Sequence, residues 1–177
     1  WEIELETIED QNLIQILESQ KAEANLQFGK FIERNYEDWF DEKADKPVLS
    51  HKLFGEFVAP EIRKKDKPIL FIVIDNLRLD QWKIFESIVY NHYKVEKEAN
   101  YYSILPTATQ YARNAIFSGL LPLEMEKKFP QYWKNDTEDG GKNLHEADFL
   151  NEQLKRLGLN IKSEYYKITN LRDGKKL

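Results

Sequence analysis

The chain has 177 residues, 41% of them hydrophobic, and 26 Lys and Arg against 31 Asp and Glu give it a net charge of −5. A chain of this length can bury a hydrophobic core, and no apolar run approaches the roughly 20 residues of a membrane span. The absence of Cys excludes disulfides, thiolate zinc fingers and Cys nucleophiles. We therefore expect a cytoplasmic protein.

The charge is divided unevenly along the chain. Residues 1–46 carry 13 acidic and five basic side chains, a net charge of −8, whereas residues 47–177 carry 18 acidic and 21 basic, a net charge of +3. The change falls beside the helix breaker Pro47. We therefore predict an acidic segment over 1–46 and a second domain over 47–177. The start without Met and the unfinished polar end lead us to expect a fragment of a longer protein.

The acidic segment is predicted to be helical from Thr7 to about Phe40. It contains no Pro there, and apolar residues recur at steps of three and four. Thr7 and Asp10 form a candidate capping box, while the polar residues 19–20 leave open whether there is one helix or two. The apolar stripe is either a face that packs on a neighbouring element or a surface for dimerisation or signalling.

Residues 68–74 form a continuous β-branched and aromatic run, which is typical of a central parallel strand buried on both faces. A polar turn begins at Asp75, and residues 81–91 show the pattern of an amphipathic helix. Ligands of open α/β sheets bind beyond the carboxyl ends of the strands, and Asp75 lies at such a place. Its carboxylate can bind a metal, cap the following helix or pair with Arg78.

A second predicted strand, residues 100–105, enters the turn Pro106-Thr107-Ala108-Thr109, and a helix follows over 110–120. A Thr at the start of a helix is either a cap or a nucleophile placed where backbone N–H groups favour phosphate oxygens. A further helix is predicted from Asn143 or Leu144 to about Leu157 and a further strand from Leu159 to Ile168. This alternation of strands and helices predicts an α/β fold.

Two motifs carry a resemblance to a known family. Pro106-Thr107-Ala108-Thr109, followed by Ser118-Gly119-Leu120-Leu121-Pro122, resembles the nucleophile segment of the alkaline phosphatase superfamily, closest in spacing to its nucleotide pyrophosphatase/phosphodiesterase members. Asp75-Asn76-Leu77-Arg78-Leu79-Asp80 resembles the PglZ branch. The whole chain is similar to PorX-type response regulators of Bacteroidetes, which join a receiver domain, a helical bundle and a PglZ domain and regulate type IX secretion.

The resemblance implies an alkaline-phosphatase-like fold, a mostly parallel sheet flanked by helices, preceded by an α-helical bundle segment. Residues 47–177 would be the N-terminal part of a PglZ domain, and the receiver domain and the C-terminal half would lie outside the chain. The implied function is control of type IX secretion by a zinc-dependent phosphodiesterase acting on nucleotides or oligonucleotides. A sensor kinase, a sigma factor and a second copy of the chain are the implied partners. The alternative is a non-catalytic module that binds a sigma factor or a secretion component.

The resemblance also implies roles for individual residues. Asp75 would be a zinc ligand, and Thr109 would be the nucleophile that also touches the metal, with Thr107 as the fallback. Two metals about 4 Å apart can bind both the attacking and the leaving oxygen of a phosphoryl transfer. The implied substrate contacts are Asn76, Arg113 and Asn114.

The histidines His51, His92 and His145 do not form close ligand pairs in the sequence, and each is expected to be a surface or structural residue. In the family that the chain resembles, the remaining zinc ligands come late in the domain, so the resemblance implies that they lie beyond Leu177. For the same reason we expect the chain by itself to bind metal incompletely and to show no turnover.

Overall fold

The computed structural model describes residues 10–41, 46–64 and 67–175. The contacts between Cα atoms divide the chain into two units, which are described separately below. The first unit comprises Trp1–Pro47 and Asn76–Glu98, and the second comprises Val48–Asp75 and Ala99–Leu177. None of the described helices is long and apolar enough to cross a membrane.

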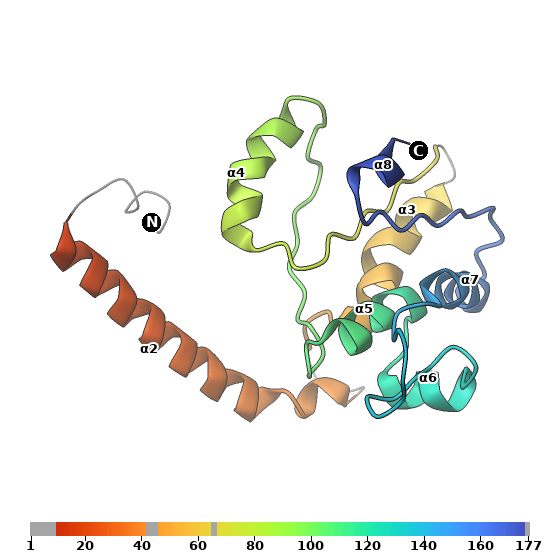
Figure 1. Ribbon diagram of the computed structural model, residues 1–177, viewed down its shortest axis with the longest axis horizontal. Coiled ribbons are helices and arrows are strands. Elements are labelled where there is room, and N and C mark those ends of the chain that lie inside the picture. Colours follow the sequence, from red (N-terminus) through yellow and green to blue (C-terminus); the bar gives the residue numbers. More distant parts are fainter. Residues whose placement is uncertain (1–9, 42–45, 65–66, 176–177) are drawn as a thin grey trace. The chain divides into compact units, whose positions relative to one another are not determined.

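The longest element of the first unit is helix α2, Gln11–Asn35 (Figure 1). The side chain of Asp10 accepts hydrogen bonds from two backbone N–H groups of the first turn, so Asp10 is the N-cap. The helix runs without a break through residues 19–20, which decides for one helix over two. Thr7, the other half of the predicted capping box, lies outside the described residues.

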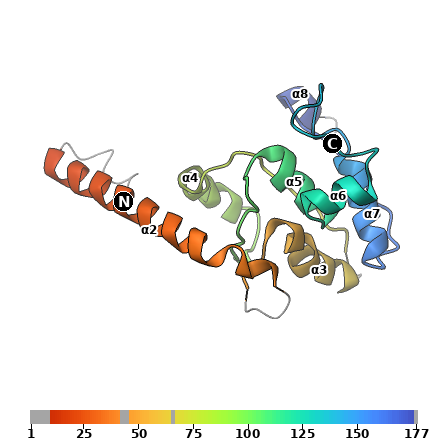
Figure 2. The same cartoon turned by 90° about the horizontal axis from the view of Figure 1, so that it is seen from below.

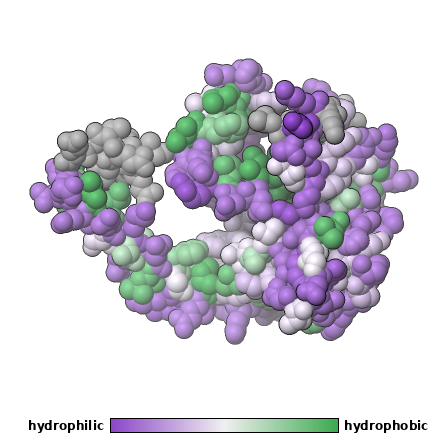
Figure 3. Space-filling view, in the orientation of Figure 1, coloured by the Kyte–Doolittle hydropathy of each residue, from purple (hydrophilic) through white to green (hydrophobic). Residues whose placement is uncertain are grey.

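The side chains of α2 are all at least partly exposed, although apolar residues recur along it. A buried aromatic side chain, Trp39, follows in the short 3₁₀ helix η1, Asp38–Phe40. Figure 3 shows hydrophobic side chains on the surface of α2 between hydrophilic ones. The large apolar residues of α2 that are exposed are Leu13, Ile16, Leu26, Phe28 and Phe31.

The predicted helix at 81–91 is confirmed as α4, Leu79–Tyr90. Its N-cap is Arg78, whose backbone N–H donates to the side chain of Gln81 at 3.0 Å. The guanidinium of Arg78 also forms an ion pair with Asp80 at 2.7 Å. This hydrogen bond to Arg78 lowers the pKa of Asp80 to about 2, so the first turn of α4 keeps a negative charge.

The second unit begins with an extended stretch followed by three short helical pieces: η2 (Ser50–Lys52), the π-helical turn η3 (Phe54–Val58) and α3 (Ala59–Lys64). Residues 50–64 therefore form a helical stretch that is irregular. Ser50 is fully buried, and its hydroxyl accepts a hydrogen bond from the backbone N–H of Ile104 at 3.1 Å.

The predicted parallel sheet is wrong, because the described residues contain no β-strand. Their one β-pairing is an isolated parallel bridge between Leu49 and Tyr102. Residues 68–74 are extended but lie outside any ladder, and several of their large side chains face solvent, among them Leu70 at 78% exposure. An apolar run favours burial, but a strand also needs neighbours for its backbone hydrogen bonds. The same correction applies to the strands expected at 100–105 and 159–168.

The second unit is organised around α5, Thr109–Ser118. This helix contacts α6 (Pro122–Lys128), α7 (Glu146–Arg156) and η2. Figure 2 shows α5, α6 and α7 grouped together, and α8, Leu171–Gly174, near the end of the chain. The helices expected at 110–120 and 143–157 are thus confirmed, with the second starting two or three residues later than expected.

Apolar side chains from both ends of the unit form its core. Phe54 and Ala59 pack with Leu154 and Leu159, and Phe71 from the extended stretch packs against this cluster. The rings of Phe71 and Phe117 lie 6.3 Å apart, which joins the cluster to α5. The core therefore fixes α5 between the extended stretch that ends in Asp75 and helix α7.

Replacing Gly119 with Ala should lower the free energy of unfolding by about 2 to 4 kcal/mol. Gly119 ends α5 with φ of 64°, and a Cβ there would lie 2.2 Å from Oε1 of Gln153. The amide of Gln153 is buried and donates to the carbonyl oxygens of Ile116 and Phe117, so it cannot move without losing both bonds.

Thermal denaturation followed by circular dichroism measures this effect. Gly55→Ala is the matched control, because a Cβ on Gly55 meets no atom within 4 Å. We expect Gly55→Ala to leave the melting temperature unchanged or slightly higher. Equal melting temperatures for the two variants would contradict the role given to Gly119.

Candidate functional site

Helix α5 carries two of the predicted site residues on one face. Thr109 is its first residue, and the N-cap position is held by Ala108, whose side chain offers no hydrogen bond. Arg113 follows Thr109 by four residues, the spacing that places two side chains above one another. The Thr109 hydroxyl donates instead to the Asp75 carboxylate, so the structure assigns Thr109 a contact that helix capping does not explain.

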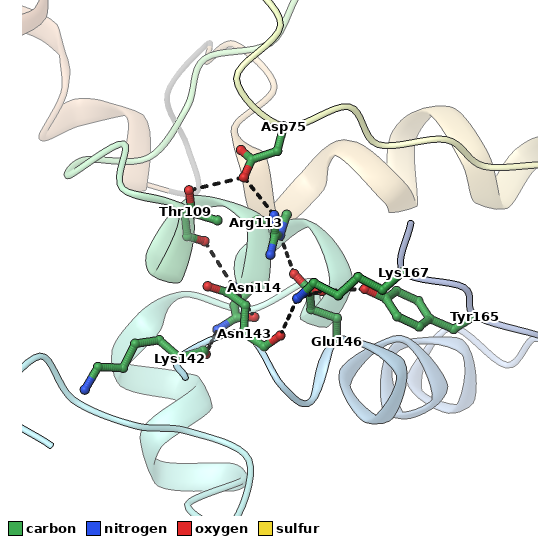
Figure 4. Close-up of polar contacts among 9 residues, drawn as sticks. All are labelled: Asp75, Thr109, Arg113, Asn114, Lys142, Asn143, Glu146, Tyr165 and Lys167. Carbon is green, nitrogen blue, oxygen red and sulfur yellow. Dashed lines mark hydrogen bonds and ion pairs between the residues drawn. The ribbon is translucent and has the colours of Figure 1, made fainter. Parts of the chain in front are cut away.

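Asp75 is likewise not a helix cap. The next helix, α4, begins at Leu79 with Arg78 as its N-cap. The carboxylate of Asp75 receives two contacts on the same oxygen, Oδ2: the Thr109 hydroxyl at 3.5 Å and Nη1 of Arg113 at 2.8 Å. Half of the Asp75 side chain is exposed to solvent. Thr109 and Arg113 therefore converge on one oxygen of the half-exposed Asp75 carboxylate (Figure 4).

A second carboxylate lies behind Arg113. Glu146, the first residue of α7, has only 2% of its side chain exposed, and its Oε1 accepts from Nε of Arg113. Its other oxygen, Oε2, accepts from the Tyr165 hydroxyl and lies 3.5 Å from Nζ of Lys167. Burial, with the hydrogen bond to Glu146 as the next cause, raises the pKa of Tyr165, so this hydroxyl keeps its proton at neutral pH.

The first turn of α5 is tied to the loop before α7 by amide groups. Nδ2 of Asn143 donates to the backbone oxygen of Thr109 at 3.2 Å and to Oδ1 of Asn114 at 2.9 Å. Asn114 is buried and donates to the backbone oxygen of Lys142 at 3.1 Å. Lys167 donates to the backbone oxygen of Asn143 at 3.0 Å. These bonds fix the backbone on which Thr109 sits.

The other predicted site residues lie in different settings. The amide of Asn114 is used within the protein, as described above, rather than at the Asp75 oxygen. Asn76 directly follows Asp75 in the chain with φ of 59°, a left-handed conformation that Asn tolerates. It belongs to the first unit, and its contact with substrate stays a prediction. Thr107 is exposed and precedes the N-cap of α5.

The donors around Asp75 suit part of a metal site. A carboxylate oxygen and a hydroxyl oxygen are hard ligands that zinc and magnesium accept. In the part of the chain that the structure describes, no cluster of three or more His, Cys, Asp or Glu side chains could hold a metal ion. Asp75 and Thr109 by themselves supply two oxygens, fewer than the four ligands that zinc usually takes. Of the histidines, His145, the N-cap residue of α7, pairs with Asp148 in the first turn of that helix at 2.9 Å.

Comparison with known proteins assigns both parts of the sequence. Residues 53–176 match the family model described as the BREX system PglZ alkaline phosphatase-like domain. The chain belongs to the PglZ family. Residues 1–40 match the PorX response regulator linker domain, and the two matches together agree with a PorX-type response regulator. A comparison with curated proteins finds no match to this chain.

The PglZ match gives the site a chemical context. The alkaline phosphatase-like superfamily to which PglZ belongs is usually metal-dependent, and the linker match fits a response regulator of a two-component system. The matched stretch contains Asp75, Thr109 and Arg113 as well as Glu146 and Lys167. The PglZ region therefore holds the whole cluster of charged groups described above.

Three residues of the cluster were not predicted from the sequence: Glu146, Lys167 and, as a partner of a carboxylate, Tyr165. Glu146 reads locally as an ordinary acidic residue in the first turn of a helix, where the helix dipole favours it. Glu146 follows Asn143 and Leu144 at a predicted helix start. That position alone does not indicate that a residue contacts a functional side chain. Only the packing of α7 against α5 brings Glu146 to Arg113.

Proposed function

We propose that this chain is part of the output region of a cytoplasmic two-component response regulator that controls type IX secretion. Its PglZ domain hydrolyses phosphodiesters of nucleotides or oligonucleotides, with zinc as cofactor and Thr109 as nucleophile. A sensor kinase upstream, a sigma factor downstream and a second copy of the chain are the partners in this proposal. The observation that carries the enzymatic part is the convergence of Thr109, Asp75 and Arg113 on one carboxylate oxygen.

In the proposed hydrolysis, Asp75 and Thr109 have separate roles. Asp75 and Thr109 would hold a zinc ion through their oxygens, together with ligands from the rest of the protein. Zinc bound there supplies positive charge that favours the alkoxide form of a hydroxyl and stabilises phosphate oxygens. The hydroxyl oxygen of Thr109 lies 3.5 Å from Oδ2 of Asp75, a carboxylate oxygen that can accept the hydroxyl proton during attack.

The covalent steps balance without a further reagent. Oγ1 of Thr109 attacks phosphorus, the bond from phosphorus to the leaving alcohol breaks, and the alcohol takes up the proton that the threonine lost. A water molecule then cleaves the phosphothreonine ester and restores the hydroxyl. The products are a phosphomonoester and an alcohol. Arg113, one turn along the helix, is placed to donate to a non-bridging phosphate oxygen.

The local charge supports a requirement for metal. The cluster contains two carboxylates, Asp75 and Glu146, and two cations, Arg113 and Lys167, so its ionic charges sum to zero. A phosphodiester anion gains little from a neutral cluster, and the N–H groups at the start of α5 supply only partial positive charge. A divalent cation on Asp75 gives the cluster the net positive charge that an anion needs.

Hydrolysis of bis(p-nitrophenyl) phosphate by the intact protein tests the proposal. We expect release of p-nitrophenolate that EDTA abolishes and stoichiometric zinc restores, since zinc provides the missing charge. The competing hypothesis is a non-catalytic module that binds a sigma factor or a secretion component. It predicts that the intact, zinc-loaded protein releases p-nitrophenolate no faster than buffer with the same zinc.

A further inference from the structure

Glu146 combines near-complete burial with three polar partners. Its side chain is 2% exposed, and each of its oxygens is occupied: Oε1 by Nε of Arg113, and Oε2 by Tyr165 and Lys167 (Figure 4). A buried carboxylate is costly unless it is paired and hydrogen-bonded, so this arrangement has a specific geometry. Nothing in the chemistry proposed above uses Glu146 directly.

We propose that Glu146 is a positioning residue that holds the guanidinium of Arg113 in the orientation for binding substrate phosphate. This inference rests on the proposed function. A guanidinium is planar, so fixing its Nε edge against Glu146 also fixes the direction of the Nη1 and Nη2 edges. In this structure, the fixed plane directs Nη1 to Asp75 beside the Thr109 hydroxyl.

Solvent exposure distinguishes the two carboxylate partners of Arg113. The side chain of Arg113 is 17% exposed, that of Glu146 2% and that of Asp75 50%. Ion pairs that water reaches are weak and screened, whereas breaking a buried pair leaves an uncompensated charge. Glu146 is therefore the permanent partner of Arg113, and Asp75 is the partner that can be exchanged for a phosphate oxygen.

The contacts at the second oxygen of Glu146 determine which of its two oxygens faces Arg113. Tyr165 and Lys167 both lie on Oε2, which leaves Oε1 for the guanidinium. Because the pKa of Tyr165 is raised by its burial, its hydroxyl stays a donor and does not compete as an anion. The carboxylate cannot turn without losing these contacts, so Oε1 stays directed at Nε of Arg113.

The test measures the affinity of the intact, zinc-loaded protein for inorganic phosphate by isothermal titration calorimetry. Glu146→Gln should weaken phosphate binding about tenfold, because a charge-assisted hydrogen bond that orients the guanidinium is lost. Tyr166→Phe is the matched control: it removes an exposed tyrosine hydroxyl that donates to Glu164 and not to Glu146, so the pair with Arg113 and its supporting contacts remain. We expect its phosphate affinity to stay within about twofold of the unmodified protein.

A double-mutant comparison separates positioning from a general effect on folding. In an Arg113→Ala background, Glu146→Gln should change phosphate affinity by less than about twofold, since the group that it positions is gone. A tenfold loss in that background as well would overturn the inference. The inference would also be overturned if Arg113→Ala weakened phosphate binding but the single variant Glu146→Gln bound phosphate as tightly as the unmodified protein. In either case the proposed function stands, whereas failure of the unmodified protein to bind phosphate would overturn both.

A measurement on the unmodified protein covers the case in which Glu146→Gln does not fold. The Nε–H resonance of Arg113, assigned by its absence in Arg113→Lys, should exchange slowly with water in a ¹H–¹⁵N spectrum. Slow exchange is expected both with and without phosphate, because the bond to Glu146 persists in both states. Exchange as fast as that of an exposed arginine would overturn the inference.

Discussion

Thr109→Val should lower kcat for zinc-dependent hydrolysis of bis(p-nitrophenyl) phosphate by roughly a thousandfold or more, the order of loss when a nucleophile is removed. Valine keeps the shape and β-branching of threonine, so the first turn of α5 keeps its geometry. What disappears is the oxygen that lies 3.5 Å from Oδ2 of Asp75. The measurement is steady-state release of p-nitrophenolate by the intact protein at saturating zinc.

Thr107→Val discriminates between the two threonines of the turn. Thr107 is exposed and lies before the N-cap of α5, so its replacement should leave most of the activity. If Thr107→Val abolished hydrolysis and Thr109→Val did not, the nucleophile would be Thr107. If Thr109→Val showed no melting transition, its loss of activity would reflect loss of folding and not loss of the nucleophile. Thr109→Ser, which retains a hydroxyl, would then replace it, and its activity would be compared with that of the unmodified protein.

Asp75→Asn should weaken zinc binding by the intact protein about a hundredfold or more, because a neutral amide oxygen replaces an anionic ligand. The variant should fold normally. Half of the Asp75 side chain is exposed, and its ion pair with Arg113 is therefore partly screened by water. Competition with a chromophoric chelator measures the affinity, and the melting temperature checks the fold.

Arg113→Ala should have the opposite effect on the same measurement. The guanidinium occupies Oδ2 of Asp75 at 2.8 Å, so a metal ion on that oxygen must displace it. Removing the competing cation should tighten zinc binding by about threefold to tenfold, while phosphate binding weakens. A loss of zinc affinity in Arg113→Ala would show that Arg113 supports the metal site and does not compete for its carboxylate.

The four longest of the described helices, α2, α4, α5 and α7, could be predicted from local patterns. In α2, apolar residues at steps of three and four, together with Asp10 at its start, specify the helix to within a few residues. These signals are local because each turn of a helix makes its hydrogen bonds within itself. The break considered at residues 19–20 does not occur, since a polar stretch without Gly or Pro does not interrupt those bonds.

The sheet could not be predicted in the same way. The run at 68–74 has strand-like composition, but its hydrogen-bond partners would have to come from other parts of the chain. In the described residues such pairing is limited to the bridge between Leu49 and Tyr102, and much of the run remains exposed. The composition of a segment indicates whether it suits a β-strand, whereas a β-ladder also requires a neighbouring strand to accept and donate its backbone hydrogen bonds.

For the candidate site too, some features follow from the sequence and others only from the tertiary structure. The sequence by itself determined the acidic start, the helices, the family resemblance, and Asp75, Thr109 and Arg113 as residues of interest. Only the tertiary structure decided that these three meet at one carboxylate oxygen and that the buried Glu146, held by Tyr165 and Lys167, stands behind Arg113. A helix can be predicted because the spacing of its apolar residues is local in the sequence. The ion pair between Arg113 and Glu146 depends instead on how α5 and α7 pack against each other.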